Sequence, residues 1–306
     1  MNTKAHPGVY AAVLTPLTAD LSPDLESIPI LLDFLAKRGC HGALLLGTTG
    51  EGPSFAPPQR EQIFRAALHV RQQHSDFQIL AGTGTPSLDE TVQLTRLAFD
   101  LGLDGVVVLP PYYYRQAGDD GLYAWFSHVL QRGVPSGGPL LGYHIPPVSG
   151  VPLSIELLKR LKEDFPDRFA GIKDSSSNPE HAVLLGETFG DDLFVLNGND
   201  RLFSLALQNH ASGCITALAN LKSPDLRRIW DAYQQADDKN GEFDAAAQER
   251  LDAGRGVVDR YPPAAPLLKA LISRLYDFPC WPVLPPLTPM KPEDVDKALD
   301  EFVAVG

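Results

Sequence analysis

A lysine inside an apolar segment is the residue of this sequence with the clearest chemical potential. Lys173 lies in the run Phe-Ala-Gly-Ile-Lys-Asp-Ser-Ser, which begins at Phe169. A buried amine is costly unless it is paired or loses its proton, and an uncharged amine can attack a keto group and form a Schiff base. Lys173 is therefore a candidate nucleophile toward keto substrates. A lysine at a strand end that pairs with Asp174 is the alternative interpretation.

Two groups of tyrosines are candidates for proton transfer. Three tyrosines follow one another at 112–114, and because they cannot all face one core, at least one should reach a pocket or a subunit interface. Tyr143 lies in the apolar run just before the one that carries Lys173, where a phenol can exchange a proton with a substrate hydroxyl beside an imine. An aromatic interface patch and a structural tyrosine bonded to the backbone remain the alternatives.

A turn rich in small residues is a candidate carboxylate site. It reads Gly-Thr-Thr-Gly-Glu-Gly over residues 47–52, and it offers the hydroxyls of Thr48 and Thr49 together with backbone N–H donors. A tight turn between a strand and a helix would also need these glycines. The segment alone leaves both interpretations open.

Eight short apolar runs alternate with longer amphipathic segments along the chain. Each run is apolar on both faces, as buried parallel strands require. The expected strands cover residues 9–15, 43–47, 79–82, 106–110, 140–145, 170–173, 193–196 and 214–217. The expected helices cover about 25–38, 58–73, 88–101, 119–131, 154–162, 179–187, 200–209 and 224–235.

This order of elements predicts an α/β fold, a (β/α)8 TIM barrel, over residues 1–235. Residues 236–306 should form a C-terminal helical appendix, with helices at 241–258, 264–276 and 292–303. The stretch 278–292 is too rich in proline for a helix, so we expect it to pack in an extended form. An open doubly wound sheet is less consistent, because the glycines at 47–52 do not have dinucleotide-binding spacing.

Composition narrows the class of partner. The chain has 306 residues and a formal net charge of -12, which disfavours nucleic acids and anionic membranes as partners. The three cysteines are far apart, the N-terminus lacks an apolar signal core, and no run is long enough to span a membrane, so we predict a cytoplasmic protein. His69 and His74 are five residues apart and His144 stands alone, so the histidines predict no metal site.

Taken together, the motifs resemble those of the dihydrodipicolinate synthase and N-acetylneuraminate lyase family, whose members are pyruvate-dependent class I aldolases and related lyases. The similarity runs from the first strand to the Leu-Pro-Pro-Leu-Thr-Pro stretch that begins at Leu284. It is carried by four motifs in the same order, at residues 48–51, 111–113, 143–146 and 171–174.

The resemblance implies a role for each matching position. Lys173 would form the imine with pyruvate, so that no cofactor or metal is needed, and Tyr143 would be the acid-base phenol. Thr48 and Thr49 would hold the substrate carboxylate. Tyr113 would be lent across a subunit interface in a homotetramer built as a dimer of dimers. Gly198 and Ile215 would line the site through backbone groups.

One departure from the family motif bears on the substrate. A dihydrodipicolinate synthase would carry an arginine for the second substrate's carboxylate where this chain has Val148, and valine cannot replace that bidentate contact. His144 and Tyr114 also stand where asparagine is common in the family. We therefore expect a lyase that reversibly splits a 4-hydroxy-2-oxo acid, a 2-keto-3-deoxy sugar acid or a sialic-acid-like compound, into pyruvate and an aldehyde. A dihydrodipicolinate synthase, a sugar-acid dehydratase and a non-catalytic keto-acid-binding relative are the alternatives.

Overall fold

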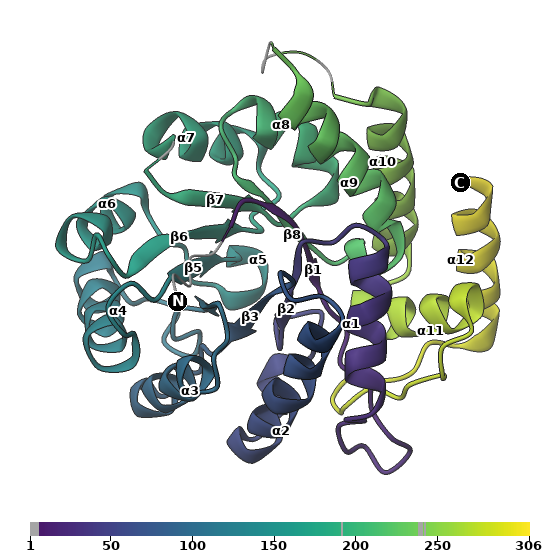
Figure 1. Ribbon diagram of the computed structural model, residues 1–306, viewed down its shortest axis with the longest axis horizontal. Helices are drawn as coiled ribbons and strands as arrows, with labels where there is room; N and C mark the ends of the chain where they lie inside the picture. The colour runs from purple at the N-terminus through teal and green to yellow at the C-terminus, as the bar shows by residue number, and fades with distance from the viewer. Residues whose placement is uncertain (1–5, 191, 238–240, 242) are drawn as a thin grey trace.

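Eight parallel strands form a closed barrel in the order in which they occur along the chain, which confirms the predicted (β/α)8 TIM barrel (Figure 1). The computed structural model describes residues 6–190, 192–237, 241 and 243–306. The strands are β1 (Gly8–Ala12), β2 (Gly42–Leu45), β3 (Gln78–Gly82), β4 (Gly105–Val108), β5 (Leu140–His144), β6 (Phe169–Asp174), β7 (Phe194–Asn197) and β8 (Gly213–Thr216).

Alternation along each strand divides the core into two layers. Side chains that point into the barrel form a small inner cluster, in which Tyr143 and Ile215 pack with aliphatic residues such as Leu44 and Leu196. Side chains that point outward join the larger cluster beneath the surrounding helices. Both faces of each strand are therefore buried, which explains why the strands read as short, continuous apolar runs.

Helices surround the barrel, and two of them begin at serine caps. Ser87 accepts from the N–H of Glu90, and Ser154 accepts from the N–H of Leu157. The helices of the barrel are α1 (Ser27–Lys37), α2 (Pro57–Ala67), α3 (Leu88–Asp100), α4 (Asp119–Gly133), α5 (Pro146–Ser149), α6 (Ile155–Asp164), α7 (Pro179–Phe189), α8 (Phe203–Gln208) and α9 (Ala219–Gln235).

Several predicted boundaries were wrong. The first strand ends at Ala12 rather than residue 15, and the helix predicted over 58–73 is the α-helix α2 followed by a tighter 3₁₀ segment, Leu68–Gln72. Likewise, the helix predicted over 200–209 is a 3₁₀ turn followed by α8. Helix α9 begins five residues before the predicted residue 224, because a first turn precedes a kink at Lys222. The short helix α5 was missed, since two prolines open it.

Three further helices follow α9, namely α10 (Ala245–Arg260), α11 (Ala264–Tyr276) and α12 (Pro292–Ala304). Figure 1 shows them together on one side of the barrel, where α10 and α11 pack against α9. The segment between α11 and α12 has no regular structure, and it buries Trp281 and Val283. The domain division at residue 235 stays a prediction.

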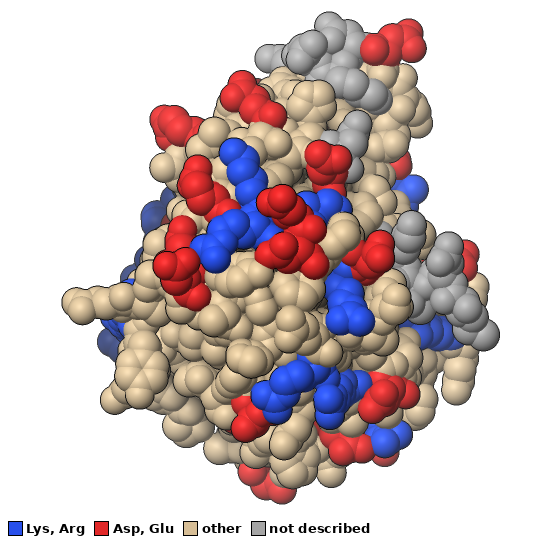
Figure 2. Space-filling model, turned by 90° about the vertical axis from the view of Figure 1, so that its left-hand side faces the viewer, with Lys and Arg blue, Asp and Glu red and all other residues tan. Residues whose placement is uncertain are grey.

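The charged residues form no broad patch of one sign on the face that Figure 2 shows, where acidic and basic side chains are interspersed. Arg160 of α6, for example, pairs with Asp120 of α4 at 2.8 Å. Among the helices of the described residues, none is both long enough and apolar enough to cross a membrane.

Candidate active site

Register between two neighbouring strands brings Lys173 and Tyr143 together. Tyr143 of β5 lies directly beside Lys173 of β6, and parallel pairing directs both side chains into the barrel. Lys173 is 2% exposed, and its Nζ lies 4.2 Å from the centroid of the Tyr143 ring. These two residues lie at the carboxyl ends of their strands, which is the end of a TIM barrel where catalytic groups gather.

Asp174 does not pair with Lys173, so the alternative interpretation of the lysine was wrong. Successive residues of a strand point to opposite faces, and Asp174 therefore lies on the outer side of the barrel. There its carboxylate accepts from the backbone N–H of Ser176 at 3.0 Å and faces Nδ1 of His181 at 3.3 Å. Burial alone would raise the pKa of Asp174, but these neighbours outweigh burial and lower the pKa.

The phenol of Tyr143 is buried but not isolated. Its oxygen lies 3.3 Å from Oγ1 of Thr48. Burial pushes the pKa of Tyr143 upward, but the charge of Lys173 and hydrogen bonds with Thr48, Lys173 and Ser175 outweigh burial, so that the pKa falls below its usual value near 10. The surroundings thus make Tyr143 a stronger acid than an ordinary tyrosine, and its phenolate is the form that accepts a proton.

The turn after β2 brings Thr48 and Thr49 to the same end of the barrel. Thr48 is exposed and Thr49 is half-buried, and among the described residues the backbone N–H groups of Thr49 and Gly50 have no backbone acceptor. Hydroxyls and free N–H groups together can bind a carboxylate. Because Thr48 also contacts Tyr143, a carboxylate on this turn would lie next to the phenol.

Gly198 and Ile215 occupy different positions around this end. Gly198 follows β7, and its N–H donates to the carbonyl of Asp174 at 2.6 Å. A Cβ at this position would meet Oγ of Ser175 at 1.9 Å, so only glycine fits between β6 and β7. Ile215 of β8 is fully buried in the inner cluster that contains Tyr143.

Tyr113 does not join the cluster within this chain. Its side chain is 76% exposed, and its ring meets the edge of Tyr114 with the centroids 5.3 Å apart. The structure therefore brings together Lys173, Tyr143 and Thr48, while Tyr113 lies on the surface beyond β4.

His144 is not alone, contrary to the expectation from the sequence. The start of α7 places the ring of His181 parallel to it, with centroids 4.5 Å apart, and Asp174 completes a group whose ligand atoms lie within 4.8 Å of one another. These residue types can bind Zn²⁺. However, Nδ1 of His144 accepts from the N–H of Leu153 at 3.0 Å, so in the neutral ring Nε2 carries the proton and has no lone pair for a metal. Burial, more than any other influence, lowers the pKa of His144 to about 4 and keeps the ring neutral.

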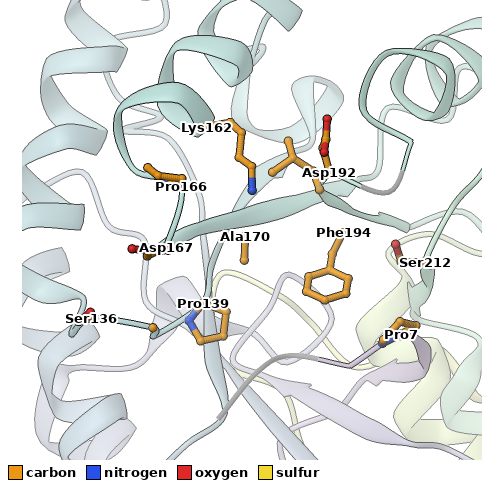
Figure 3. Close-up of a pocket in the computed structure, with 12 residues that line it drawn as sticks. Pro7, Ser136, Pro139, Lys162, Pro166, Asp167, Ala170, Asp192, Phe194 and Ser212 are labelled. Atoms are coloured by element: carbon orange, nitrogen blue, oxygen red, sulfur yellow. The ribbon is translucent and has the colours of Figure 1, made fainter. Parts of the chain in front are cut away.

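A large pocket lies at the other end of the barrel. Figure 3 shows Lys162, Phe194 and Ser212 around it, and its volume is about 620 Å³. Its lining residues lie just before β1 and β5 to β8 or in the first residues of β6 and β7, which places the pocket at the amino ends of the strands. It contains none of the predicted site residues.

Two residues near the site were missed by the sequence analysis. Ser175 follows the Lys173 strand and bonds with Tyr143, but a serine in a loop gives no distinctive signal. Lys269 of α11 reaches Glu51, the residue after the Thr-Thr-Gly turn, with 2.6 Å between Nζ and Oε1. Lys269 does have a signal, because it lies in the apolar run Pro-Leu-Leu-Lys-Ala-Leu-Ile that begins at Pro266. The same pattern drew attention to Lys173.

The fold is a TIM barrel, and the comparisons with known proteins place the chain among lyases. Residues 5–301 match the model of the dihydrodipicolinate synthetase family, and the chain belongs to this family.

Three similar proteins place the chain more closely. A protein of Chloroflexus aurantiacus, named as an uncharacterized DapA-like lyase, is 38% identical over 94% of this chain and 93% of its own length. The crystal structure of dihydrodipicolinate synthase from Agrobacterium tumefaciens has a TM-score of 0.86 and 30% identity, with 97% of this chain and 99% of the other covered. YagE of E. coli K12, solved in complex with pyruvate, has a TM-score of 0.87 and 25% identity, with 98% of both chains covered.

Proposed function

We propose that the protein is a class I aldolase that reversibly cleaves a 4-hydroxy-2-oxo acid to pyruvate and an aldehyde through a Schiff base on Lys173. The observation that carries the proposal is the pairing of a buried lysine with a phenol of lowered pKa at the carboxyl end of the barrel. A site that only bound a keto acid would need neither the amine nor the phenol. The YagE complex, which contains pyruvate, supports the choice of keto acid.

In this mechanism the Lys173 amine attacks the C2 carbonyl of the substrate, and water leaves as the iminium ion forms. The bond between C3 and C4 then breaks, and its electron pair moves toward the iminium nitrogen to give an enamine. At the same time the Tyr143 phenolate takes the proton of the C4 hydroxyl, so that C4 leaves as the aldehyde. Protonation of the enamine at C3 and addition of water release pyruvate and restore the amine.

The turn at 48–50 would bind the carboxylate of the keto acid. Its two hydroxyls and the N–H groups of Thr49 and Gly50 supply donors without adding a competing negative charge. This placement fixes C2 relative to Lys173 and leaves the variable part of the substrate toward the barrel mouth. The chemistry is complete without a metal or an organic cofactor.

A synthase reaction on the same imine is the second candidate, because the similar Agrobacterium protein is a dihydrodipicolinate synthase. Val148 argues against it, since this side chain is 58% exposed on α5 and offers no charge for a second carboxylate. A dehydratase would share the imine and differ in losing water instead of an aldehyde.

Borohydride reduction in the presence of pyruvate, followed by intact mass and peptide mapping, tests the mechanism. We expect a pyruvate-sized adduct on Lys173. A folded sample without an adduct would overturn the imine mechanism. A product assay with keto-deoxy sugar acids, sialic acid and aspartate semialdehyde as partners then separates cleavage, synthesis and dehydration.

The proposal includes a cytoplasmic homotetramer in which Tyr113 serves the site of a neighbouring subunit. The exposed pair of Tyr113 and Tyr114 supports this role, because large apolar side chains at the surface are typical of interfaces. We predict that Tyr113→Phe lowers turnover about tenfold or more while pyruvate binding changes less, because a relayed proton matters only in the reaction. Steady-state kinetics and pyruvate titration measure the two effects, and equal losses in both would contradict the relay.

A further inference from the structure

We infer that Lys269, in the C-terminal appendix, is a positioning residue that holds the carboxylate-binding turn in its working shape. The inference rests on the proposed function, because that function gives the turn its ligand. Lys269 touches none of the residues to which the reaction is assigned, and it acts through Glu51.

The ion pair between Lys269 and Glu51 is completely enclosed. The side chain of Lys269 is 1% exposed and that of Glu51 is 0% exposed, and 2.6 Å separates Nζ from Oε1. Each partner has one further bond to the proline-rich segment. Nζ donates to the carbonyl of Pro282 at 2.7 Å, and Oε2 accepts from the N–H of Leu284 at 2.7 Å. Removing one charge of such a pair leaves the other buried without compensation.

The backbone at Glu51 explains why this anchor matters. Glu51 has a φ of 56°, in the left-handed region that a residue with a side chain seldom adopts. The neighbouring carbonyls are also held, since Gly50 accepts from Oγ1 of Thr15 and Gly52 accepts from Nη2 of Arg60, both at 2.7 Å. Apart from the 3.3 Å contact between Oγ1 of Thr48 and the Tyr143 phenol, the side chains of Thr48 and Thr49 form no hydrogen bond or ion pair with the other described residues. Their position therefore depends on the residues that follow them, and Glu51 is the one fixed by charge.

The appendix makes a second contact of the same kind with another loop at the carboxyl end. Arg255 of α10 reaches the fully buried Asp200, beyond β7, with 3.5 Å between Nη1 and Oδ2. In addition, Gln248 of α10 donates to the carbonyl of Asp200 at 3.0 Å. Two loops at this end of the barrel thus form ion pairs with charged residues of the appendix. The appendix therefore contacts the candidate site's loops through charges as well as packing against the outer helices.

The test compares the complete wild-type chain with Lys269→Met, and with Glu51→Gln combined with Lys269→Met. Lys269→Gln is included because its amide can still donate to Glu51. The matched control is Arg260→Met, which removes an ion pair between α10 and α12, with 2.9 Å between Nε of Arg260 and Oε2 of Glu301. This pair forms no hydrogen bond or ion pair with the described residues of the turn. Borohydride trapping over a range of pyruvate concentrations, steady-state kinetics and thermal unfolding are measured for each.

We expect Lys269→Met to raise the KM for pyruvate about tenfold while kcat stays within about twofold, because the reacting groups remain and only the carboxylate contacts are displaced. Lys269→Gln should recover part of the lost affinity, and Arg260→Met should match the wild type. If Lys269→Met fails to fold, the double variant, which buries no charge at either position, decides the question through the same rise in KM.

Two outcomes separate the inference from the proposed function. In the first outcome, borohydride traps pyruvate on the wild type, but the KM is unchanged in the folded Lys269 variants. This result would overturn the positioning role and leave the aldolase proposal intact. A wild-type protein that traps no pyruvate would overturn the aldolase proposal itself.

Discussion

Lys173 and Lys269 are the two most deeply buried lysines among the described residues, and their surroundings differ. Lys269 extends from α11 to the turn after β2, where its Nζ lies 2.6 Å from Oε1 of Glu51. Lys173 lies at the end of β6 beneath the ring of Tyr143, and among the described residues no carboxylate lies within ion-pair distance of it. Burial is thus nearly equal, at 1% and 2% exposed, while the partners are opposite in kind.

The difference shows that burial of an amine does not by itself identify a nucleophile. Burial lowers the pKa of Lys269 and outweighs the opposing effect of Glu51, whose carboxylate is the ion-pair partner of this amine. Lys173 has the Tyr143 phenol and ring face beside it instead of a fixed anion. A lysine should be assigned to chemistry only when its partner can also take part in the reaction.

The sharpest test of this comparison is Lys173→Met. We expect activity to fall by at least about 10³-fold, with no borohydride adduct, because no other amine can replace the nucleophile. Thermal unfolding should be unchanged or shifted upward, since the substitution removes a buried cation without leaving a buried anion. Lys269→Met should do the reverse, with lower thermal stability and a retained adduct. Similar behaviour of the two variants would break the comparison.

The next effect in size is expected for Tyr143→Phe. Loss of the phenol should lower kcat for cleavage by about 10²- to 10⁴-fold, the usual contribution of a positioned acid or base. The imine should still form, because Lys173 is intact. Intact mass after borohydride reduction checks that the imine forms, and steady-state rates check the loss of cleavage. An unchanged cleavage rate would remove Tyr143 from the mechanism.

A smaller effect concerns pH. The bond from Thr48 is one of the contacts that lower the pKa of Tyr143, so Thr48→Val should raise that pKa. Because cleavage needs the phenolate, its rate rises as pH passes upward through this pKa, and in Thr48→Val the rise should occur at higher pH. The pH profile of kcat in the wild type and in Thr48→Ser, which keeps the hydroxyl, provides the reference. Coincident profiles for valine and serine would contradict the assignment.

The smallest effect is expected at the amino ends of the strands. Lys162→Met alters the large pocket of Figure 3 but should leave the rate and the pyruvate KM within about twofold of the wild type. The pocket beside Tyr143 and Gly47 has a volume of only about 10 Å³, so the larger cavity lies away from the chemistry. Loss of activity in Lys162→Met would mean that the two ends of the barrel are coupled.

The sequence predicted the barrel well because its signal is local. Each strand is a short apolar run, and each cap involves residues three positions apart, as at Ser87 and Ser154. The adjacency of Tyr143 and Lys173 could also be predicted, since both end consecutive parallel strands. Neither the Glu51 and Lys269 pair nor the stacking of His144 on His181 could be predicted in this way. These contacts depend on how helices that are distant in the sequence pack against the barrel. The periodic pattern of apolar residues contains no information about that packing.

The bond between Leu284 and Glu51 joins residues 233 positions apart. Synthesis on the ribosome proceeds from the N-terminus, so the turn that carries Thr48 and Thr49 leaves the ribosome long before Lys269 and Leu284 exist. The eight strands can close once β8 has emerged, but the turn gains its anchor only when α11 and the segment after it are complete. A nascent chain arrested after α9 would therefore contain all eight strands, but its Thr-Thr-Gly turn would lack the contacts from Lys269 and Leu284.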